Sequence, residues 1–251
     1  MRILLLSDIH ANLEALEACL AAAPPFDRVV NLGDIVGYGA SPNEVTARSR
    51  ELGTVFVRGN HDKASTGLMP LDDFNPMAAA AAVWTHNHLT AENLQWLRNL
   101  PQGPVTTDEI PGAQLVHGSP IDEDEYLVSL GEALAPLLTV EFPLTFFGHT
   151  HMQGGFFANG ASADAFRPEY RTIGQAESVN LQLKPETRYL INPGSVGQPR
   201  DGDWRAAFAL FDSDARIIHF HRTPYNLKSA QDRIFSAKLP SRLATRLATG
   251  Q

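Results

Sequence analysis

The chain has 251 residues, of which 43% are apolar and 19% are charged, and this balance excludes a wholly disordered protein. Its formal net charge of −8 argues against a protein that binds duplex DNA or uses basic residues to bind a membrane. The single cysteine, Cys19, excludes a disulfide framework and a thiolate zinc cluster. No apolar run approaches the roughly 20 residues that a membrane span needs, so we expect a cytoplasmic protein.

Predicted strands and helices alternate through the first half of the chain. Short apolar runs predict strands at residues 2–7, 28–32, 54–58, 105–110, 114–116 and 144–147. The first run leads directly into Ser7 and Asp8, which favours a buried strand over a signal peptide. Capping residues and apolar periodicity predict helices at residues 12–23, from 41 onwards, at 76–89, at 91–99 and from 129 onwards.

Strands dominate the second half. Residues 154–188 are polar without a helical period and are expected to form a β-hairpin and loop insertion, of which 156–186 is a candidate substrate lid or homodimer surface. Further elements are predicted as strands at 189–191, 206–211 and 217–221 and a last helix from Thr223. The tail at 239–251 carries Pro, Ser, Thr and Gly and is expected to fray. This order predicts a single α/β domain over residues 1–251, a four-layer β-sandwich of two mixed sheets flanked by helices.

Polar clusters follow five of the predicted strands. They are Asp8-Ile9-His10, Gly33-Asp34, Gly59-Asn60-His61-Asp62, His117-Gly118 and Gly148-His149-Thr150-His151. Because loops beyond the carboxyl ends of strands in α/β sheets meet at one crevice, we expect these side chains to converge.

The clusters differ in how specific they are. In a chain of this composition, D-x-H arises by chance about 0.5 times, G-H-x-H about 0.02 times and G-N-H-D about 0.002 times. Asp8 and His10 alone fit a helix cap beside a structural histidine equally well. The ordered set, with each cluster at a strand end, indicates a functional site.

The side-chain types indicate a metal site. Carboxylates and imidazoles without thiolates suit Mn, Fe, Ni, Co or Zn. One carboxylate that can bridge, with histidines on both sides, suggests two cations roughly 3.5–4 Å apart. Such a pair can lower the pKa of water from 15.7 to around 7, and its positive charge would attract phosphate into an acidic protein.

At this point the sequence resembles a known family. The runs SDIHAN, GDIVGYG, RGNHD, VHGSP, FGHTHMQ and INPGSVGQPRDG, spread over residues 7–202, resemble the calcineurin-like metallophosphoesterases, especially their small bacterial and archaeal phosphodiesterase branch. The resemblance implies a helix-flanked β-sandwich. It also implies two divalent cations, manganese first, held by Asp8, His10 and His151 on one side and by Asn60, His117 and His149 on the other, with Asp34 bridging. His61 would contact the phosphate and assist the leaving oxygen, and Asp62 would orient the His61 ring.

Two positions depart from the family pattern. Gly37 stands where the second aspartate of G-D-x-x-D is usual, which removes a carboxylate outside the ligand set. Ala11 stands where glycine is frequent. Neither position is a predicted ligand.

Other residues allow a functional and a structural interpretation. Tyr38 is a candidate for stacking on a nucleobase, with packing slightly favoured, and Ser195 and Arg200 are candidate substrate contacts. In a helix His86 and His88 diverge by about 200° and cannot face one ion together, whereas His219 and His221 share a strand face within an apolar run. We expect structural roles for both pairs.

We therefore expect a hydrolase in which a hydroxide bridging the metals attacks phosphorus in line. The resemblance favours phosphodiester or phosphoanhydride bonds of small nucleotides as substrate. The alternatives are a phosphomonoesterase or protein serine/threonine phosphatase, and a non-catalytic scaffold of the same fold. A scaffold predicts replaced ligands, whereas all seven positions here carry a suitable side chain.

Overall fold

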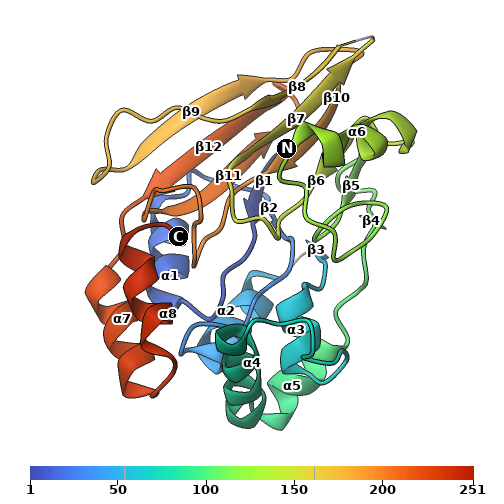
Figure 1. Ribbon diagram of the computed structural model, residues 1–251. Coiled ribbons are helices and arrows are strands. Elements are labelled where there is room, and N and C mark those ends of the chain that lie inside the picture. Colours follow the sequence, from blue (N-terminus) through green and yellow to red (C-terminus); the bar gives the residue numbers. More distant parts are fainter. Residues whose placement is uncertain (54, 161) are drawn as a thin grey trace.

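The computed structural model describes residues 1–53, 55–160 and 162–251, and in them it has two mixed six-stranded β-sheets with helices outside (Figure 1). This architecture confirms the predicted fold class. The strands are β1 (Arg2–Leu6), β2 (Arg28–Asn31), β3 (Val55–Phe56), β4 (Val105–Thr106), β5 (Ala113–Leu115), β6 (Leu144–Phe146), β7 (Gly154–Asn159), β8 (Ser162–Phe166), β9 (Glu177–Gln182), β10 (Arg188–Asn192), β11 (Ala206–Asp212) and β12 (Ile217–Thr223).

Each sheet contains a parallel segment. The first sheet has the order β3-β2-β1-β11-β12-β9, in which β1, β2 and β3 are parallel. The second has the order β4-β5-β6-β10-β7-β8, in which β5, β6 and β10 are parallel. The parallel strands of each sheet therefore end at a common edge, which is where the polar clusters of the sequence begin.

Helices cover the outer faces of both sheets. In Figure 1, α1, α7 and α8 lie outside the first sheet, α6 lies outside the second, and α2–α5 group at one end of the molecule. The helices are α1 (Leu13–Ala22), α2 (Pro42–Leu52), α3 (Asn60–Ser65), α4 (Pro76–His88), α5 (Ala91–Arg98), α6 (Leu130–Thr139), α7 (Leu227–Ser236) and α8 (Ser241–Thr245), followed by the 3₁₀ turn η1 (Arg246–Ala248).

Strand β1 shows how the sequence specifies the layers. Ile3 and Leu5 point into the core between the sheets, and Leu4 and Leu6 point into the core beneath the helices. Side chains alternate between the two faces of a strand, so a continuous apolar run is what a strand buried on both faces requires. Both layers of core therefore hold β1 in place, and Asp8 follows directly.

Several boundaries differ from the predictions. The strand expected at 105–110 ends at Thr106, and the last helices begin at Leu227, where Asn226 caps α7, because Thr223 still belongs to β12. The short helix α3 was not predicted, since its residues carry the polar G-N-H-D motif instead of an apolar stripe. Thr54, the first residue of one predicted strand, lies outside the described residues.

The tail at 239–251, expected to fray, is instead packed. Leu239, Leu243 and Leu247 are buried in the core beside α1 and α7. The correction has a simple cause: Leu243 in α8 and Leu247 in η1 are four residues apart and lie on one face, Leu239 precedes them at the same spacing, and the polar Arg242 and Thr245 face solvent. Among the described helices, none has the length and apolar character needed to cross a bilayer.

Candidate metal centre

The polar clusters meet at the edge where the parallel strands end. Asp8 and His10 follow β1, and Asp34 follows β2. Asn60 opens α3 just beyond β3, and the second sheet contributes His117 after β5 and His149 and His151 after β6. The convergence expected from the topology is thus present in the structure.

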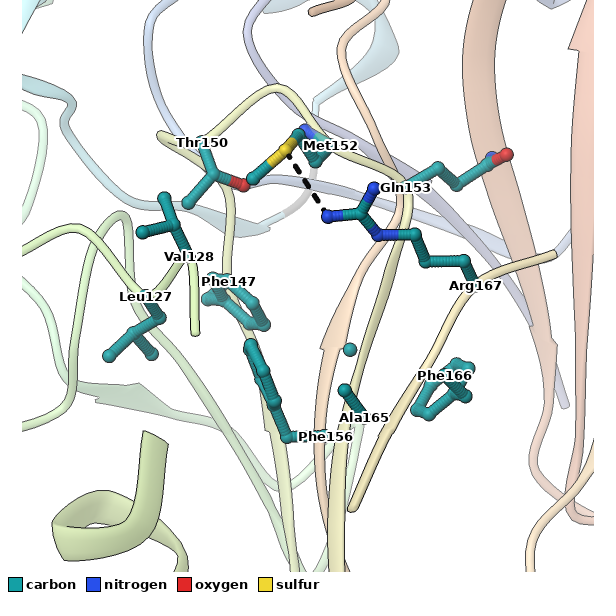
Figure 2. A pocket seen from close by; sticks show the side chains of 11 residues that line it. Leu127, Val128, Phe147, Thr150, Met152, Gln153, Phe156, Ala165, Phe166 and Arg167 are labelled. Atoms are coloured by element: carbon teal, nitrogen blue, oxygen red, sulfur yellow. Dashed lines mark hydrogen bonds between the residues drawn. The ribbon is translucent and has the colours of Figure 1, made fainter. Parts of the chain in front are cut away.

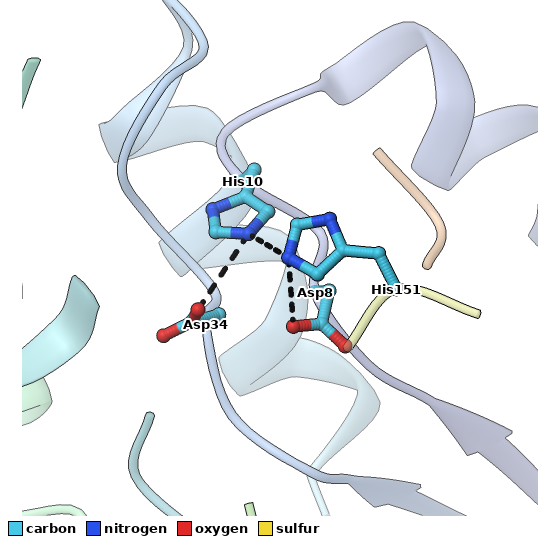
Figure 3. A group of neighbouring side chains, drawn as sticks. All are labelled: Asp8, His10, Asp34 and His151. Atoms are coloured by element: carbon cyan, nitrogen blue, oxygen red, sulfur yellow. Dashed lines mark hydrogen bonds and ion pairs between the residues drawn. The ribbon is translucent and has the colours of Figure 1, made fainter. Parts of the chain in front are cut away.

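One group of ligand atoms surrounds a point between Asp8, His10, Asp34 and His151 (Figure 3). The four atoms lie within 4.8 Å of one another, and all four residues are buried. The Nε2 atoms of His10 and His151 are 3.0 Å apart. His10 Nε2 is also 3.5 Å from Asp34 Oδ2, and His151 Nε2 is 3.3 Å from Asp8 Oδ1.

A second group shares Asp34 and adds His117 and His149. Its ligand atoms also lie within 4.8 Å of one another. His117 Nε2 is 3.4 Å from Asp34 Oδ2 and 3.3 Å from the Oδ1 atom of Asn60, so the amide oxygen extends this group. Asp34 is the one residue common to both groups, which is the arrangement that a bridging carboxylate requires.

Hydrogen bonds to the far nitrogens of the histidines fix their tautomers. Nδ1 of His10, His117 and His151 donates to the carbonyls of Val36 (3.1 Å), Leu32 (2.7 Å) and Gln198 (2.6 Å). His149 donates through Nε2 to the carbonyl of Asp124 at 3.1 Å. In the neutral form of each ring, the opposite nitrogen then carries a lone pair directed into the site, as in ligated histidines generally.

Electrostatics keep most of these rings neutral. Burial lowers the pKa of His149 to about 3 and places the pKa of His10 and His151 below the usual range. His117 differs: burial opposes its charged form, but the carboxylate of Asp34 raises its pKa to about 10. Neutral imidazoles are the form that binds cations.

These residues fit divalent cations. Oδ2 of Asp34 is buried without a hydrogen-bond partner among the described residues, between the Nε2 atoms of His10 and His117. Two imidazole lone pairs that face each other at 3.0 Å, as in His10 and His151, repel unless a proton or a cation lies between them. The nitrogen and oxygen donors suit borderline-to-hard metals, and the six residues of the two groups fit a dinuclear site.

The backbone around the ligands is strained. Asp8, His10, Ala11, Asp34, Tyr38, His149 and His151 all have positive φ. Non-glycine residues in this region cost of order 1–3 kcal/mol each and cluster at functional sites. Ala11 has φ +51°, so the glycine that is frequent there in the family is the residue that this backbone prefers.

Close approach also requires glycine at position 59. A Cβ on Gly59 would lie 2.1 Å from Oδ1 of Asp34. That oxygen accepts a hydrogen bond from the backbone amide of His61 at 2.8 Å. The glycine therefore lets the start of α3 approach Asp34 closely enough to orient its carboxylate.

Asp62 does not orient the His61 ring, and the predicted role is corrected. Its carboxylate accepts hydrogen bonds from the backbone amides of Asp34 (2.9 Å), Gly59 (3.0 Å) and Val36 (3.1 Å). Consecutive residues of a helix point about 100° apart, so the two side chains diverge. Asp62 instead holds together the loops that carry the ligands, and Nδ1 of His61 is buried without a hydrogen-bond partner among the described residues.

Gly37 leaves room for the His61 ring, which accounts for the absence of the aspartate that is usual at this position in the family motif. With φ +92°, a Cβ at this position would lie 2.7 Å from Nδ1 of His61. Burial lowers the pKa of His61 to about 4, so the ring is neutral at pH 7. It packs against Tyr38 at 4.3 Å and edge-on against Phe74 at 5.1 Å between ring centroids.

Gly37→Ala should therefore do more damage than a strained backbone alone. We expect a loss of about 1–3 kcal/mol in the free energy of unfolding from the positive φ, plus displacement of the His61 ring. Gly67→Ala is the matched control, because Gly67 has φ +74° with nothing within 4 Å of an added Cβ. Urea unfolding and phosphoester turnover of both variants separate the effects: equal turnover would contradict the contact with His61.

A loop that sequence reasoning missed supports His149. The Tyr126 ring stacks on the His149 ring at 3.7 Å between ring centroids. Nε2 of His149 donates a hydrogen bond to the carbonyl of Asp124 in the same loop. Lys63, only 5% exposed, binds the carboxylate of Asp124 at 2.6 Å and that of Glu123 at 3.0 Å. The 60-residue separation between these partners leaves no local signal in the sequence.

Lys63→Met should loosen this loop. We expect the free energy of unfolding to fall by about 1.5–3 kcal/mol, the usual loss for hydrogen bonds to charged groups. The cation bound by His149 should bind about 10–100-fold more weakly, which is the usual loss when a group that positions a metal ligand is removed. Titration with Mn²⁺ measures this, and Lys63→Arg should restore most of the affinity. Wild-type affinity in the methionine variant would show that the loop does not position His149.

The structure separates the three candidate substrate contacts. Tyr38 is 5% exposed and packs its ring against His10 and His61, which favours the packing interpretation, but it also lines a cavity of about 270 Å³ together with Asn60 and His149. Ser195 is fully buried, donates to the carbonyl of Asp8 at 2.7 Å and accepts from the amide of Gln198, so it supports the Asp8 loop instead of contacting substrate. Arg200 is half-buried beside the Tyr38 hydroxyl at 3.4 Å and remains a candidate.

The histidines outside the clusters have local partners. His86 meets the carbonyl of Ser65 at 2.9 Å, and His88 stacks on Trp84. His219 meets Asn180, and His221 stacks on Phe208. None of them faces a shared ion position among the described residues.

Two cavities with room for more than one water border the site, beside a void of about 10 Å³ next to His10. One, of about 270 Å³, opens above Asn60, His61 and His149. The other, of about 50 Å³, lies between Thr150, Met152, Phe156 and Arg167 and has room for only a few waters (Figure 2). Among the described residues, none from 156–186 lines the larger cavity, so that segment does not cover the site in this conformation.

Comparisons with known proteins agree with this fold. The calcineurin-like phosphoesterase superfamily domain matches residues 1–216. The chain is 35% identical to an uncharacterized protein of Methanocaldococcus jannaschii over 99% of this chain and 98% of that one. It is also similar to the crystal structure of a metallophosphoesterase from Sphaerobacter thermophilus, at 41% identity and TM-score 0.85, covering 100% and 99% of the two chains. A hypothetical protein from Pyrococcus horikoshii shares the fold, at 22% identity and TM-score 0.78, over 100% and 98%.

Proposed function

The chain belongs to the calcineurin-like phosphoesterase superfamily, and from this we propose that it is a binuclear metal-dependent phosphoesterase. The proposed reaction is hydrolysis of phosphodiester or phosphoanhydride bonds in small nucleotides. One observation carries the proposal: Asp34 belongs to both ligand groups, and its Oδ2 atom is buried without a hydrogen-bond partner among the described residues.

The roles follow from the contacts. Asp8, His10 and His151 would hold one cation, Asn60, His117 and His149 the other, and Asp34 both. Bound divalent cations supply Lewis acidity toward the phosphoryl oxygens and a hydroxide nucleophile at neutral pH. The nitrogen and oxygen donors make manganese the first metal to test, with iron, nickel, cobalt and zinc as alternatives.

The protein's own groups orient the substrate. His61 lines the 270 Å³ cavity, and its neutral ring can donate a hydrogen bond to the phosphoryl or leaving oxygen. Asp62 fixes the loops that carry Asp34 and Asn60 through three backbone amides. The guanidinium of Arg200, beside Tyr38, is placed to balance phosphate charge.

The test is turnover of bis(p-nitrophenyl) phosphate by metal-stripped protein with and without added Mn²⁺. We expect hydrolysis only with metal, and faster hydrolysis of the diester than of p-nitrophenyl phosphate. A protein that is inert under both conditions would be a scaffold. Monoester turnover a hundredfold faster than diester turnover would assign a phosphomonoesterase instead.

A further inference from the structure

The 270 Å³ cavity lined by Asn60, His61 and His149 opens onto the metal centre. The ligands His10, His117 and His151 are at most 1% exposed, so protein closes the other sides. Asn60, His61 and His149 form the floor of the 270 Å³ cavity. A phosphoryl group that reaches the ligands must therefore extend its leaving group into this cavity.

Aromatic rings form two walls of the cavity. Phe74, from the segment that precedes α4, meets the His61 ring edge-on. Tyr126, from the loop between β5 and α6, lies flat against His149 and is 45% exposed. Met69 and Ala78 add apolar surface. Such walls suit a flat apolar group, which gains from offset stacking and burial.

The charges of the cavity are acidic. No arginine or lysine lines it among the described residues, whereas Asp73 and Asp124 do. Lys63 neutralises Asp124 at 2.6 Å, but Asp73 is exposed and has no cationic partner in the described parts of the chain. Arg200, which contacts Tyr38 and Tyr126 of the lining, also interacts with the ligand His151 and so lies close to the metal centre. A leaving group that extended further phosphates beyond Arg200 would meet the free carboxylate of Asp73.

The size of the cavity points the same way. Its volume is slightly below the range of about 300–1,000 Å³ that is typical of small-molecule sites, which is enough for one ring system. A dinucleoside polyphosphate, with its second nucleoside and its chain of charged phosphates, matches neither the volume nor the charge.

We propose that this cavity, bounded by Phe74, Tyr126 and Asp73, is the leaving-group site and selects phosphodiesters whose leaving alcohol is an uncharged aromatic group, such as an aryl or nucleoside alcohol, over phosphoanhydrides. This selection rests on the proposed phosphoesterase function. In the hydrolysis the oxygen of a water bonds to phosphorus, and the bond from phosphorus to the leaving oxygen breaks. The leaving oxygen takes up the proton that the water gives up, which releases the alcohol and a phosphomonoester.

Binding of two phosphonates of equal charge tests the aromatic walls without turnover. Titration calorimetry of the Mn²⁺-loaded protein should show phenylphosphonate binding about tenfold more tightly than methylphosphonate, the most that one aromatic contact usually gives. In Phe74→Ala this ratio should fall toward one. Because Phe74 also touches His61, only the ratio is diagnostic, since a displaced His61 would weaken both ligands. Equal binding of the two phosphonates to the wild type would overturn the proposal.

Charge reversal at Asp73 tests the selection against anhydrides. In Asp73→Lys, kcat/KM for diadenosine tetraphosphate relative to that for thymidine 5′-(p-nitrophenyl) phosphate should rise by about tenfold. Asp72→Lys is the matched control, because Asp72 is exposed on the same segment but does not line the cavity, and its ratio should stay near that of the wild type. Equal changes in both variants, or none in either, would overturn the proposal.

These outcomes are distinct from failure of the phosphoesterase function itself. If no metal supports hydrolysis of any ester or anhydride, the proposed function fails. If diesters are hydrolysed but neither ratio changes as described, the function stands and the leaving-group assignment fails.

Discussion

Asp34→Asn should remove both cations together. Asparagine keeps the size and one oxygen of aspartate but lacks the charge that lies between His10 and His117. We expect metal content to fall from two ions per chain to fewer than one, measured by plasma mass spectrometry after removal of free Mn²⁺. Turnover should fall by at least about 100-fold, because loss of a group that only hydrogen-bonds to a metal ligand already lowers metal affinity or activity by 10–100-fold.

Asp8→Asn is the matched control for the shared role of Asp34. Asp8 contacts only the first ligand group, so this variant should lose one cation and keep the other. Unfolding of the metal-free protein provides a second check. Because the Asp34 carboxylate raises the pKa of His117 to about 10, its loss leaves the buried His117 without its ion-pair partner, so the metal-free variant should be less stable than the wild type. An Asp34→Asn protein that still holds two ions per chain would contradict the bridge.

His61→Ala should leave the cations in place and slow the reaction. The ring packs against Tyr38 and Phe74 and lines the cavity, but it belongs to neither ligand group. We expect two ions per chain and a decrease in kcat of roughly 10²–10⁴-fold, the usual contribution of a positioned proton donor. The measurement pairs metal content with turnover of bis(p-nitrophenyl) phosphate.

His88→Ala controls for the loss of a histidine. Its ring stacks on Trp84 in α4, and its Nδ1 meets the carbonyl of the same residue. Both metal content and turnover should match the wild type. If His61→Ala lost a metal, His61 would be a ligand and its assignment to the substrate would be wrong.

The sequence predicted what depends on short-range pattern. The apolar run before Asp8 predicts β1 because both faces of that strand are buried. The clusters at strand ends predict convergence because parallel strands end at a common edge. The two groups contain six buried carboxylate and imidazole side chains, and all six belong to residues that spacing and the family resemblance had identified.

The errors arose where a side chain's role depends on distant partners. Nothing next to Asp62 indicates that its carboxylate receives amides from positions 34, 36 and 59 instead of the neighbouring ring. Ser195 follows a turn near the site, yet its hydroxyl is fully engaged by Asp8 and Gln198. Such hydrogen bonds between loops appear only when the chain is folded.

The walls of the cavity were missed for the same reason. Phe74 and Tyr126 lie in loops without periodicity, and their positions depend on contacts such as that between Lys63 and Asp124. Each residue by itself resembles an ordinary exposed or half-buried aromatic, which is common on protein surfaces. They are candidates for substrate binding because they line the same cavity, and a cavity forms only when the chain is folded.

Anomalous diffraction from a crystal soaked in Mn²⁺ tests the central claim most directly. We predict two peaks on either side of Oδ2 of Asp34, one in contact with Asp8, His10 and His151 and the other in contact with Asn60, His117 and His149. A single peak, or peaks that Asp34 does not contact, would contradict the shared carboxylate on which the proposed chemistry depends.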